Sequence, residues 1–335
     1  MKPNPGYYDY WPYESRPKIT WPGGARVAFW VAPNIEFYEL DPPANLQRKA
    51  WPTPHPSVPG YSIRDYGNRV GHERQMKVLD RYGVRGSISL STALCEHHPE
   101  IITACKERNW EFFSHGIYNT RYTYGMSPDQ EREMIRDSIE TIYRHTGQQC
   151  SGYLAPALSH SDDTLDIFSE VCVEVFGEES QAGLYTCDLF HDDQPTPIKL
   201  RSGRRFISMP YSLEMNDTIV YTVNKVTPRH YLTMLKRHFD RLYAEGAESG
   251  TVMCIPTHNY QVSCPHRLAA FEEALAYITG HKDVWVSTGR EIAQYYLDNC
   301  YDQSLQDIAA KRDLHQAAKL NKPKSGGSSP AGGGA

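Results

Sequence analysis

The sequence lacks the features that mark several large classes of protein. Its 335 residues contain no run of about 18 apolar residues, so we expect no membrane-spanning helix. Lys and Arg number 35 against 40 Asp and Glu, and the net charge of -5 argues against a protein that coats nucleic acid or adheres to an acidic membrane surface. No charged region followed by an apolar stretch opens the chain, so a Sec signal peptide is not expected. We therefore expect a cytoplasmic protein that binds neither nucleic acid nor membrane.

The chain also lacks a CxxC pair and any internal repeat. Without CxxC, a zinc ribbon or a thioredoxin-type redox motif is not indicated. We expect reduced thiols that are mostly buried as small hydrophobic side chains. The eight cysteines are Cys95, Cys105, Cys150, Cys172, Cys187, Cys254, Cys264 and Cys300.

Short apolar runs alternate with amphipathic segments along the chain. Strands are predicted at 25–33, 87–90, 111–114, within 150–160, and at 185–188, 206–213, 251–258 and 284–287. Helices are predicted at 71–82, 100–109, 127–147, 164–171, 228–245 and 265–279. This alternation predicts a parallel α/β sheet, open or closed, and the length suits a single α/β barrel.

Composition divides the chain into three parts. Residues 1–24 are rich in Pro, Tyr and Trp and are predicted to form an extended arm; 25–300 form the barrel domain; 301–335 form a C-terminal helix and a flexible, Gly- and Ser-rich tail. Residues 41–66 are predicted to be a long loop, and 170–183 resemble an inserted loop. The 23 Tyr and 6 Trp are typical of subunit interfaces and lined pockets, so we expect a homo-oligomer, with Tyr38 or Tyr61 as alternative pocket residues.

Polar side chains gather after the predicted strand ends. In an α/β barrel the carboxyl ends of all strands meet on one face, which is where active sites lie. We therefore expect these residues to surround a common site: Asn34, Glu36, His115, His160, Asp188, Asn216, Asp217 and His258.

Four short motifs carry the chemistry: Asn34-Ile35-Glu36, Ser114-His115-Gly116 with Asn119, Ala155-Pro156 with His160, and Pro256-Thr257-His258. With the segments WPGGARVAFWVAPNIEFYE, RDYGNRVG, ALCEHHPEII, SHGIYN, DDQP, MPYSLEMND and VWVSTGREIA, the chain resembles the polysaccharide deacetylase-like superfamily over roughly residues 15–297. The similarity is greatest to its cytoplasmic branch of metal-independent allantoinases and cyclic-imide hydrolases. The resemblance implies a distorted (β/α) barrel.

The resemblance also implies roles for particular residues. Glu36, His115 and Asn119 stand where the metal-dependent members have their Asp, His and His ligands, and His258 matches the general acid. Asn34 replaces the usual catalytic Asp, and an amide cannot act as a base. Because two of the three ligand types are altered, and an amide oxygen is a poor zinc ligand, a divalent metal such as zinc has only weak support.

Taken together, the sequence predicts a hydrolase that cleaves a non-peptide C–N bond in a small amide, cyclic amide or imide. Glu36 and His258 are the predicted catalytic residues, and Asn34, His160, Asp188 and Asn216 are predicted to contact the substrate. Structural readings compete for each residue, since turns and helix caps use the same side chains. Two alternatives keep the fold: a metal-dependent N-deacetylase of acetylated amino sugars, and a catalytically inactive member that binds a ligand or acts as a scaffold.

Overall fold

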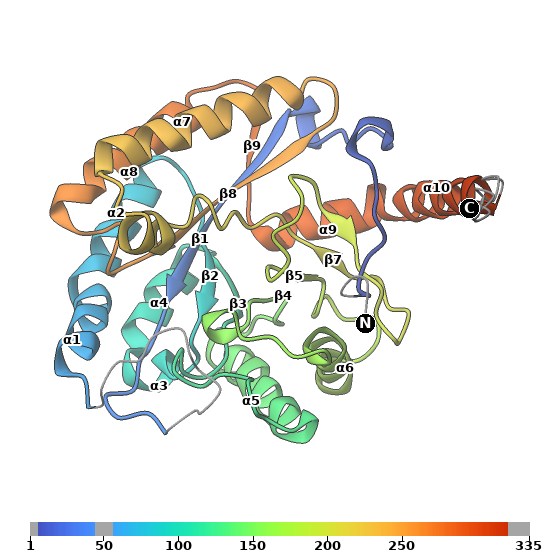
Figure 1. Ribbon diagram of the computed structural model, residues 1–335. Helices are drawn as coiled ribbons and strands as arrows, with labels where there is room; N and C mark the ends of the chain where they lie inside the picture. Colours follow the sequence, from blue (N-terminus) through green and yellow to red (C-terminus); the bar gives the residue numbers. More distant parts are fainter. Residues whose placement is uncertain (1–5, 44–55, 321–335) are drawn as a thin grey trace, which may run out of the picture.

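The computed structural model describes residues 6–43 and 56–320. Its centre is a nine-stranded sheet that curls into a distorted barrel with the helices on the outside (Figure 1), so the predicted fold class is confirmed. The strands are β1 Val27–Ile35, β2 Ser87–Leu90, β3 Glu111–Ser114, β4 Gly152–Tyr153, β5 Tyr185–Thr186, β6 Thr196–Pro197, β7 Ile207–Ser208, β8 Thr251–His258 and β9 Val284–Val286.

The strand order explains why the barrel is distorted. The sheet runs β6-β7-β5-β4-β3-β2-β1-β8, and every pair is parallel except β6 with β7. Among the described residues no ladder joins β8 to β6; instead, a backbone hydrogen bond of 2.9 Å runs from the Val252 N–H to the Asp193 carbonyl beside β6. An irregular segment therefore bridges the gap that a closed barrel would fill with a strand pair.

Strand β1 is the axis of the sheet. Its nine residues are all buried, which agrees with an uninterrupted apolar run covered on both faces. It pairs with β8 from Val27↔Thr251 to Asn34↔His258, while β9 and β2 pair with its beginning and its end. The register sets Asn34 beside His258 at the carboxyl edge, where the functional side chains were expected.

The helices lie outside the sheet, with α7 and α8 beside β8 and β9 and with α3, α4 and α5 beside β2 and β3 (Figure 1). Helix α10 follows α9 directly and extends away from the barrel. The α-helices are α1 Val58–Tyr66, α2 His72–Arg81, α3 Leu94–His97, α4 Pro99–Glu107, α5 Pro128–Thr146, α6 Thr164–Phe176, α7 Pro228–Glu245, α8 Pro265–Thr279, α9 Gly289–Asn299 and α10 Tyr301–Leu320. Single-turn and π-helical segments are η1 Tyr13–Ser15, η2 Pro22–Gly24, η3 Gly67–Gly71, η4 Pro156–Leu158 and η5 Ile219–Val223. Among the described residues no helix is both long and apolar enough to cross a bilayer.

Two predicted loops are partly helical. Within 41–66, residues 44–55 lie outside the described residues, but 58–66 form α1, because the Ser57 hydroxyl accepts the Gly60 N–H and Pro59 tolerates the first turn. Within 170–183, α6 continues to Phe176 and ends at Gly177, whose φ of 86° suits glycine. The prolines of 41–66 and the glycines of 170–183 favoured the prediction of loops, although helical residues lie beside them.

The helix starts follow local rules where the sequence predicted them. The Ser127 hydroxyl and the Gln130 side chain cap α5 reciprocally in a capping box, which agrees with the helix predicted at 127–147. Two strands are shorter than predicted, since only 185–186 and 207–208 pair in the sheet. Past those pairs the chain leaves the ladder, and the Tyr211 side chain instead meets Asn34.

Helices α1, η3 and α2 form one continuous run that packs against the loop after β8. Gly67 and Gly71 lie so close to Asn259 that a Cβ at either position would collide with it. Asn68 donates to the Glu36 carbonyl at 3.1 Å and accepts from Asn259 at 2.9 Å. The run therefore ties the end of β1 to the end of β8.

Candidate active site

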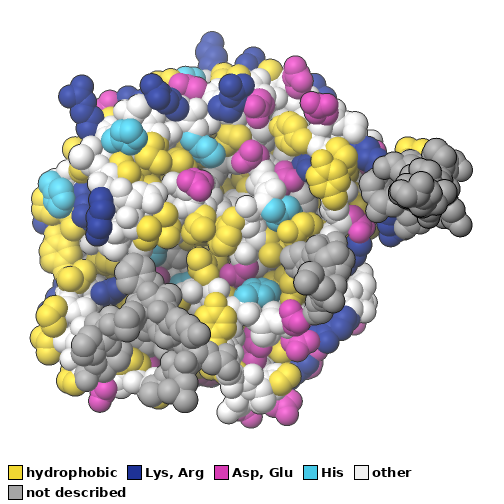
Figure 2. Space-filling view, in the orientation of Figure 1, with side chains coloured by type: hydrophobic (Ala, Val, Ile, Leu, Met, Phe, Trp, Pro, Cys, Tyr) yellow, Lys and Arg dark blue, Asp and Glu magenta, His cyan; other side chains and the backbone are white. Residues whose placement is uncertain are grey.

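A cavity of about 250 Å³ opens at the carboxyl ends of β1, β3 and β8. Figure 2 shows hydrophobic side chains gathered over the middle of one face of the molecule, with charged side chains mostly toward its rim. The cavity joins both kinds of group: its lining includes Asn34, Glu36, Tyr38, Arg64, His115, Asn119, Leu154, Tyr211, Leu213, Asn216, Ile219, Val223, His258 and Tyr260.

Glu36 is the hub of the cavity. It follows β1 directly and is 3% exposed. Its Oε1 lies 3.4 Å from Nε2 of both His115 and His258 and accepts from Asn119 Nδ2 at 2.7 Å, while Oε2 accepts from the Tyr260 hydroxyl at 2.9 Å. Burial by itself raises the pKa of Glu36, but the positive charge of His258 outweighs it and holds the pKa well below its usual range. Glu36 is therefore a carboxylate at neutral pH.

His258 ends β8 between two carboxylates. Its Nδ1 lies 2.7 Å from Asp217 Oδ1, and Asp217 Oδ2 accepts the backbone N–H groups of His258 and Val262. Burial alone would lower the pKa of His258, but the Glu36 and Asp217 carboxylates raise it to about 10. His258 is thus an imidazolium at neutral pH, with one N–H held by Asp217 and the other directed toward Glu36.

His115 follows β3 and completes the group. Its Nδ1 lies 3.0 Å from the Leu154 carbonyl. A carbonyl oxygen can only accept, so Nδ1 carries the proton and Nε2 faces Glu36. The next residue, Gly116, has φ of 71° and packs against Pro156 so closely that a Cβ would collide, which explains the glycine after the histidine.

Asn119 does not present a lone pair to this group. Its Oδ1 accepts the Ala157 N–H at 2.8 Å, so its amide nitrogen is the atom that faces Glu36 and the Tyr38 hydroxyl. A catalytic zinc needs about three protein ligands, each with a free lone pair. Asn119 offers none to this group, and no group of three or more His, Cys, Asp or Glu among the residues placed by the structure is arranged to hold a metal. The set Glu36, His115 and Asn119 therefore does not fit zinc.

Asn34 lies in the cavity, but its amide protons are in use. Nδ2 donates to the Tyr211 hydroxyl at 2.9 Å and to the Thr257 carbonyl at 3.2 Å. Because the Tyr211 oxygen accepts this bond, its own proton remains available to donate. Asn34 thus orients Tyr211 toward the cavity.

Of the other residues predicted to contact the substrate, one lines the cavity and two do not. Asn216 lines the cavity and also caps η5, since its Oδ1 accepts the Thr218 N–H at 3.0 Å. His160 and Asp188 are not in the lining: both Asp188 oxygens accept the Ala155 N–H, and His160 Nε2 lies 3.9 Å from Asp188. The structure therefore brings five predicted residues together with Glu36 in the cavity lining but leaves His160 and Asp188 to one side.

Several functional residues were not predicted from the sequence. Asp217 was expected near the common site but without a role of its own, and only the fold reveals its bond to His258. Arg64 lay in the predicted loop, and Tyr211 and Tyr260 carried no local signal. Tyr38 was considered as a pocket residue, and it does line the cavity. A hydroxyl or guanidinium near a strand end is common in any barrel, so the sequence offered no means of choosing these.

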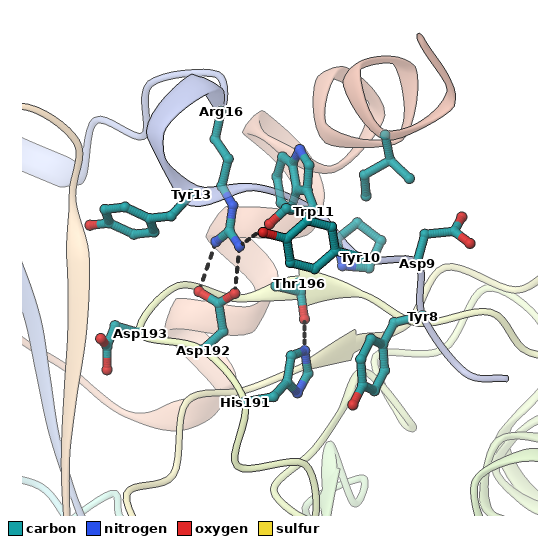
Figure 3. A pocket seen from close by; sticks show the side chains of 12 residues that line it. Tyr8, Asp9, Tyr10, Trp11, Tyr13, Arg16, His191, Asp192, Asp193 and Thr196 are labelled. Atoms are coloured by element: carbon teal, nitrogen blue, oxygen red, sulfur yellow. Dashed lines mark hydrogen bonds and ion pairs between the residues drawn. The ribbon is translucent and has the colours of Figure 1, made fainter. Parts of the chain in front are cut away.

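A second, larger cavity of about 420 Å³ lies under the N-terminal arm (Figure 3). Arg16 forms two bonds of 2.7 Å with Asp192 and donates to the Trp11 carbonyl. The Tyr8 ring stacks on His191 with centroids 4.2 Å apart. Arg16 and Asp192 therefore pair with each other at its centre, although the Arg16 Nε and the His191 Nδ1 are buried without a hydrogen-bond partner among the described residues.

Comparisons with known proteins agree with this geometry. A family model described as Polysaccharide deacetylase matches residues 61–176. A Schizosaccharomyces pombe protein named as a polysaccharide deacetylase is 25% identical over 300 residues, which cover 82% of this chain and 91% of the relative.

Two solved structures share the architecture. The crystal structure of PuuE allantoinase is 26% identical with a TM-score of 0.74 and covers 88% of this chain and 99% of its own. A Pseudomonas aeruginosa PAO1 structure described as a polysaccharide deacetylase is also 26% identical with a TM-score of 0.74, over 86% of this chain and 96% of its own.

Proposed function

Because the chain belongs to the polysaccharide deacetylase-like superfamily, we propose that it is a hydrolase that cleaves the C–N bond of a small amide, cyclic amide or imide. The observation that carries this proposal is the group formed by Glu36, His115 and His258. One carboxylate oxygen lies 3.4 Å from two imidazole nitrogens in a cavity of about 250 Å³. Similarity to an allantoinase over most of both chains supports a small cyclic substrate.

The attacking water would be held between Glu36 and His115. Both groups present a lone pair to the same point, because His115 Nδ1 keeps its proton on the Leu154 carbonyl. The low pKa of Glu36 makes this carboxylate a weak base while His258 is charged. The water proton then passes to His115 Nε2 or to Glu36 as the oxygen attacks the carbonyl carbon.

His258 would supply the proton to the departing nitrogen. As an imidazolium whose other N–H is held by Asp217, it can donate from Nε2 when the C–N bond of the tetrahedral intermediate breaks. Losing that proton removes the positive charge that lowers the pKa of Glu36, so Glu36 becomes a better acceptor in the same step. One proton leaves the water and one reaches the nitrogen, which gives a carboxylic acid and an amine or amide.

The oxyanion of the intermediate needs a donor inside the cavity. The amide protons of Asn34 are committed to Tyr211 and Thr257, which leaves the Tyr211 hydroxyl proton as the donor that Asn34 orients. A single donor of this kind contributes roughly 10²–10³ in rate. This assignment replaces Asn34 with Tyr211 as the direct contact and keeps Asn34 as a positioning residue.

A substrate screen tests the proposal. We expect hydrolysis of at least one of hydantoin, succinimide and allantoin, followed by chromatographic product analysis, and no release of acetate from acetylated amino sugars. Glu36→Gln preserves the shape of the side chain and should lose turnover. Acetate release alone would favour the amino-sugar deacetylase, whereas specific binding without turnover of any compound would favour an inactive binding protein.

A further inference from the structure

Arg64 is a charged residue of the cavity that forms no ion pair with the residues that the structure describes. It lies on α1, and its guanidinium stands over the rings of Tyr38 at 4.4 Å and Tyr260 at 5.4 Å from their centroids. Its side chain is only partly exposed and lines the same cavity as Glu36. Two aromatic faces thus fix the plane of the guanidinium.

The hydrogen bonds of Arg64 are far from complete. Nη1 donates to the Gly60 carbonyl at 3.0 Å, whereas Nε is buried and has no partner. Across the residues that the structure describes, no carboxylate forms an ion pair with Arg64. A guanidinium has five N–H donors in a fork that matches a carboxylate, and leaving a buried donor unpaired costs free energy. Because Arg64 lines the cavity, its guanidinium is placed to bind an acceptor that the described residues do not provide.

The position of Arg64 relative to the chemistry is set by the two tyrosines. The Tyr260 hydroxyl donates to Glu36 at 2.9 Å, and Asn119 donates to the Tyr38 hydroxyl at 2.6 Å. Arg64 is thus separated from the Glu36 carboxylate by one layer of rings. A negative group on a ligand would be repelled at Glu36 and attracted at Arg64, so the cavity has one end for an anion and another for the scissile bond.

We propose that Arg64 binds a carboxylate carried by the substrate, so that the enzyme acts on small amides or imides bearing an anionic group. This inference rests on the proposed hydrolase function and narrows its substrate class. The cavity volume of about 250 Å³ and the apolar lining from Leu154, Leu213 and Ile219 admit a small molecule with an apolar middle. The competing role for Arg64 is purely structural, as a cation that holds Tyr38 and Tyr260 together.

Binding of a matched ligand pair distinguishes the two roles. Succinamate and succinamide have nearly the same size and differ in one negative charge. We expect calorimetric titration to give about tenfold tighter binding of succinamate, because charge-assisted bidentate hydrogen bonds are the strong ones. Arg64→Met should abolish that preference, and Arg64→Lys should keep part of it. The control Arg69→Met removes an exposed arginine five residues further along the chain that pairs with Asp65, and it should keep the full preference.

The outcomes separate this inference from the hydrolase proposal. The titrations are repeated in the His258→Ala background, so they need no turnover. Equal affinity for both ligands in the unmodified protein, or equal weakening of both by Arg64→Met, would overturn the carboxylate assignment. If Arg64→Met fails to fold, a reduced preference in folded Arg64→Lys, or competition by malonate but not by malonamide in the unmodified protein, still decides. A retained preference with no hydrolysis of succinamate or of any compound in the substrate screen would refute only the hydrolase.

Discussion

Arg16 and Arg64 occupy two cavities of the same protein and show opposite uses of a guanidinium. Arg16, under the N-terminal arm, has a side chain that is 7% exposed and forms two bonds of 2.7 Å to Asp192 (Figure 3). Both arginines lie over aromatic rings and have a buried Nε without a hydrogen-bond partner among the described residues, but Arg64, beside Glu36, forms no ion pair with a carboxylate of those residues. A guanidinium paired with a carboxylate of its own chain serves stability, whereas one left unpaired in a cavity is available to a ligand.

The comparison predicts that substitutions in the Glu36 cavity alter turnover and that those under the arm alter stability. His258→Ala should give the largest effect, a loss of roughly 10²–10⁴ in kcat/KM, because the proton donor is removed. Steady-state kinetics measure this loss, and circular dichroism verifies the fold. His266→Ala, on the exposed side of α8, is the matched control and should retain full activity. Normal turnover by His258→Ala would contradict the assigned acid.

Arg16→Ala should instead destabilise the protein. Removing one partner of a nearly buried pair leaves Asp192 unpaired, which costs about 3–5 kcal/mol of the free energy of unfolding. Urea denaturation measures this change, and kcat/KM of the folded variant should stay within a few-fold of the parent. The exposed pair Arg69–Asp65 provides the contrast, since Arg69→Ala should change the midpoint little. A loss of turnover in Arg16→Ala without a change in stability would contradict the stabilising role assigned to Arg16.

The pH dependence sharpens the distinction further. Because the pKa of His258 is raised to about 10, activity should persist through neutral pH and fall about tenfold per pH unit above that value. The raised pKa of His258 also contributes to the stability of the folded protein. This contribution is complete below the ordinary histidine pKa of 6.5 and is lost as the pH rises through about 10. Rates and unfolding midpoints measured from pH 6 to about 11 test both statements. Asp217→Asn should move the alkaline limb of the rate profile to lower pH, whereas a limb unmoved by this change would argue against His258.

The smallest expected effect is that of a chelator. Since Asn119 faces Glu36 with its amide nitrogen, EDTA followed by dialysis should leave kcat/KM unchanged within about twofold. Metal analysis of the purified protein accompanies the assay. Loss of activity that is restored by zinc would show that the amide turns over to offer its oxygen and would favour the metal-dependent deacetylase.

The sequence was sufficient to predict which strand ends form the site, but not the hydrogen bonds between its side chains. The apolar run of β1, the histidine that ends β8 and the His115-Gly116 pair each follow local rules, so Glu36, His115 and His258 could be placed at one edge of the sheet. The bond between Asp217 and His258 joins residues 41 positions apart and depends on how the segment after β7 folds back. Such long-range pairing has no periodic signature.

Helix α1 was not predicted from the sequence for a different reason. Its sequence VPGYSIRDY contains Pro and Gly, and none of its residues is buried, so neither propensity nor amphipathic pattern marks it as helical. The Ser57 cap and continuity into η3 and α2 stabilise it instead. Arg64 was missed for that reason, because a residue in a presumed loop has no defined neighbours.

The glycine contacts of that helical run have an evolutionary consequence. Gly67 and Gly71 lie in direct contact with Asn259. The backbone segment that carries Arg64 therefore cannot move closer to the segment that carries Tyr260. New ligand preferences in relatives that keep both glycines should therefore arise by exchanging side chains on a fixed frame. Lengthening the chain at this junction would shift the arginine, the tyrosine and the carboxylate together.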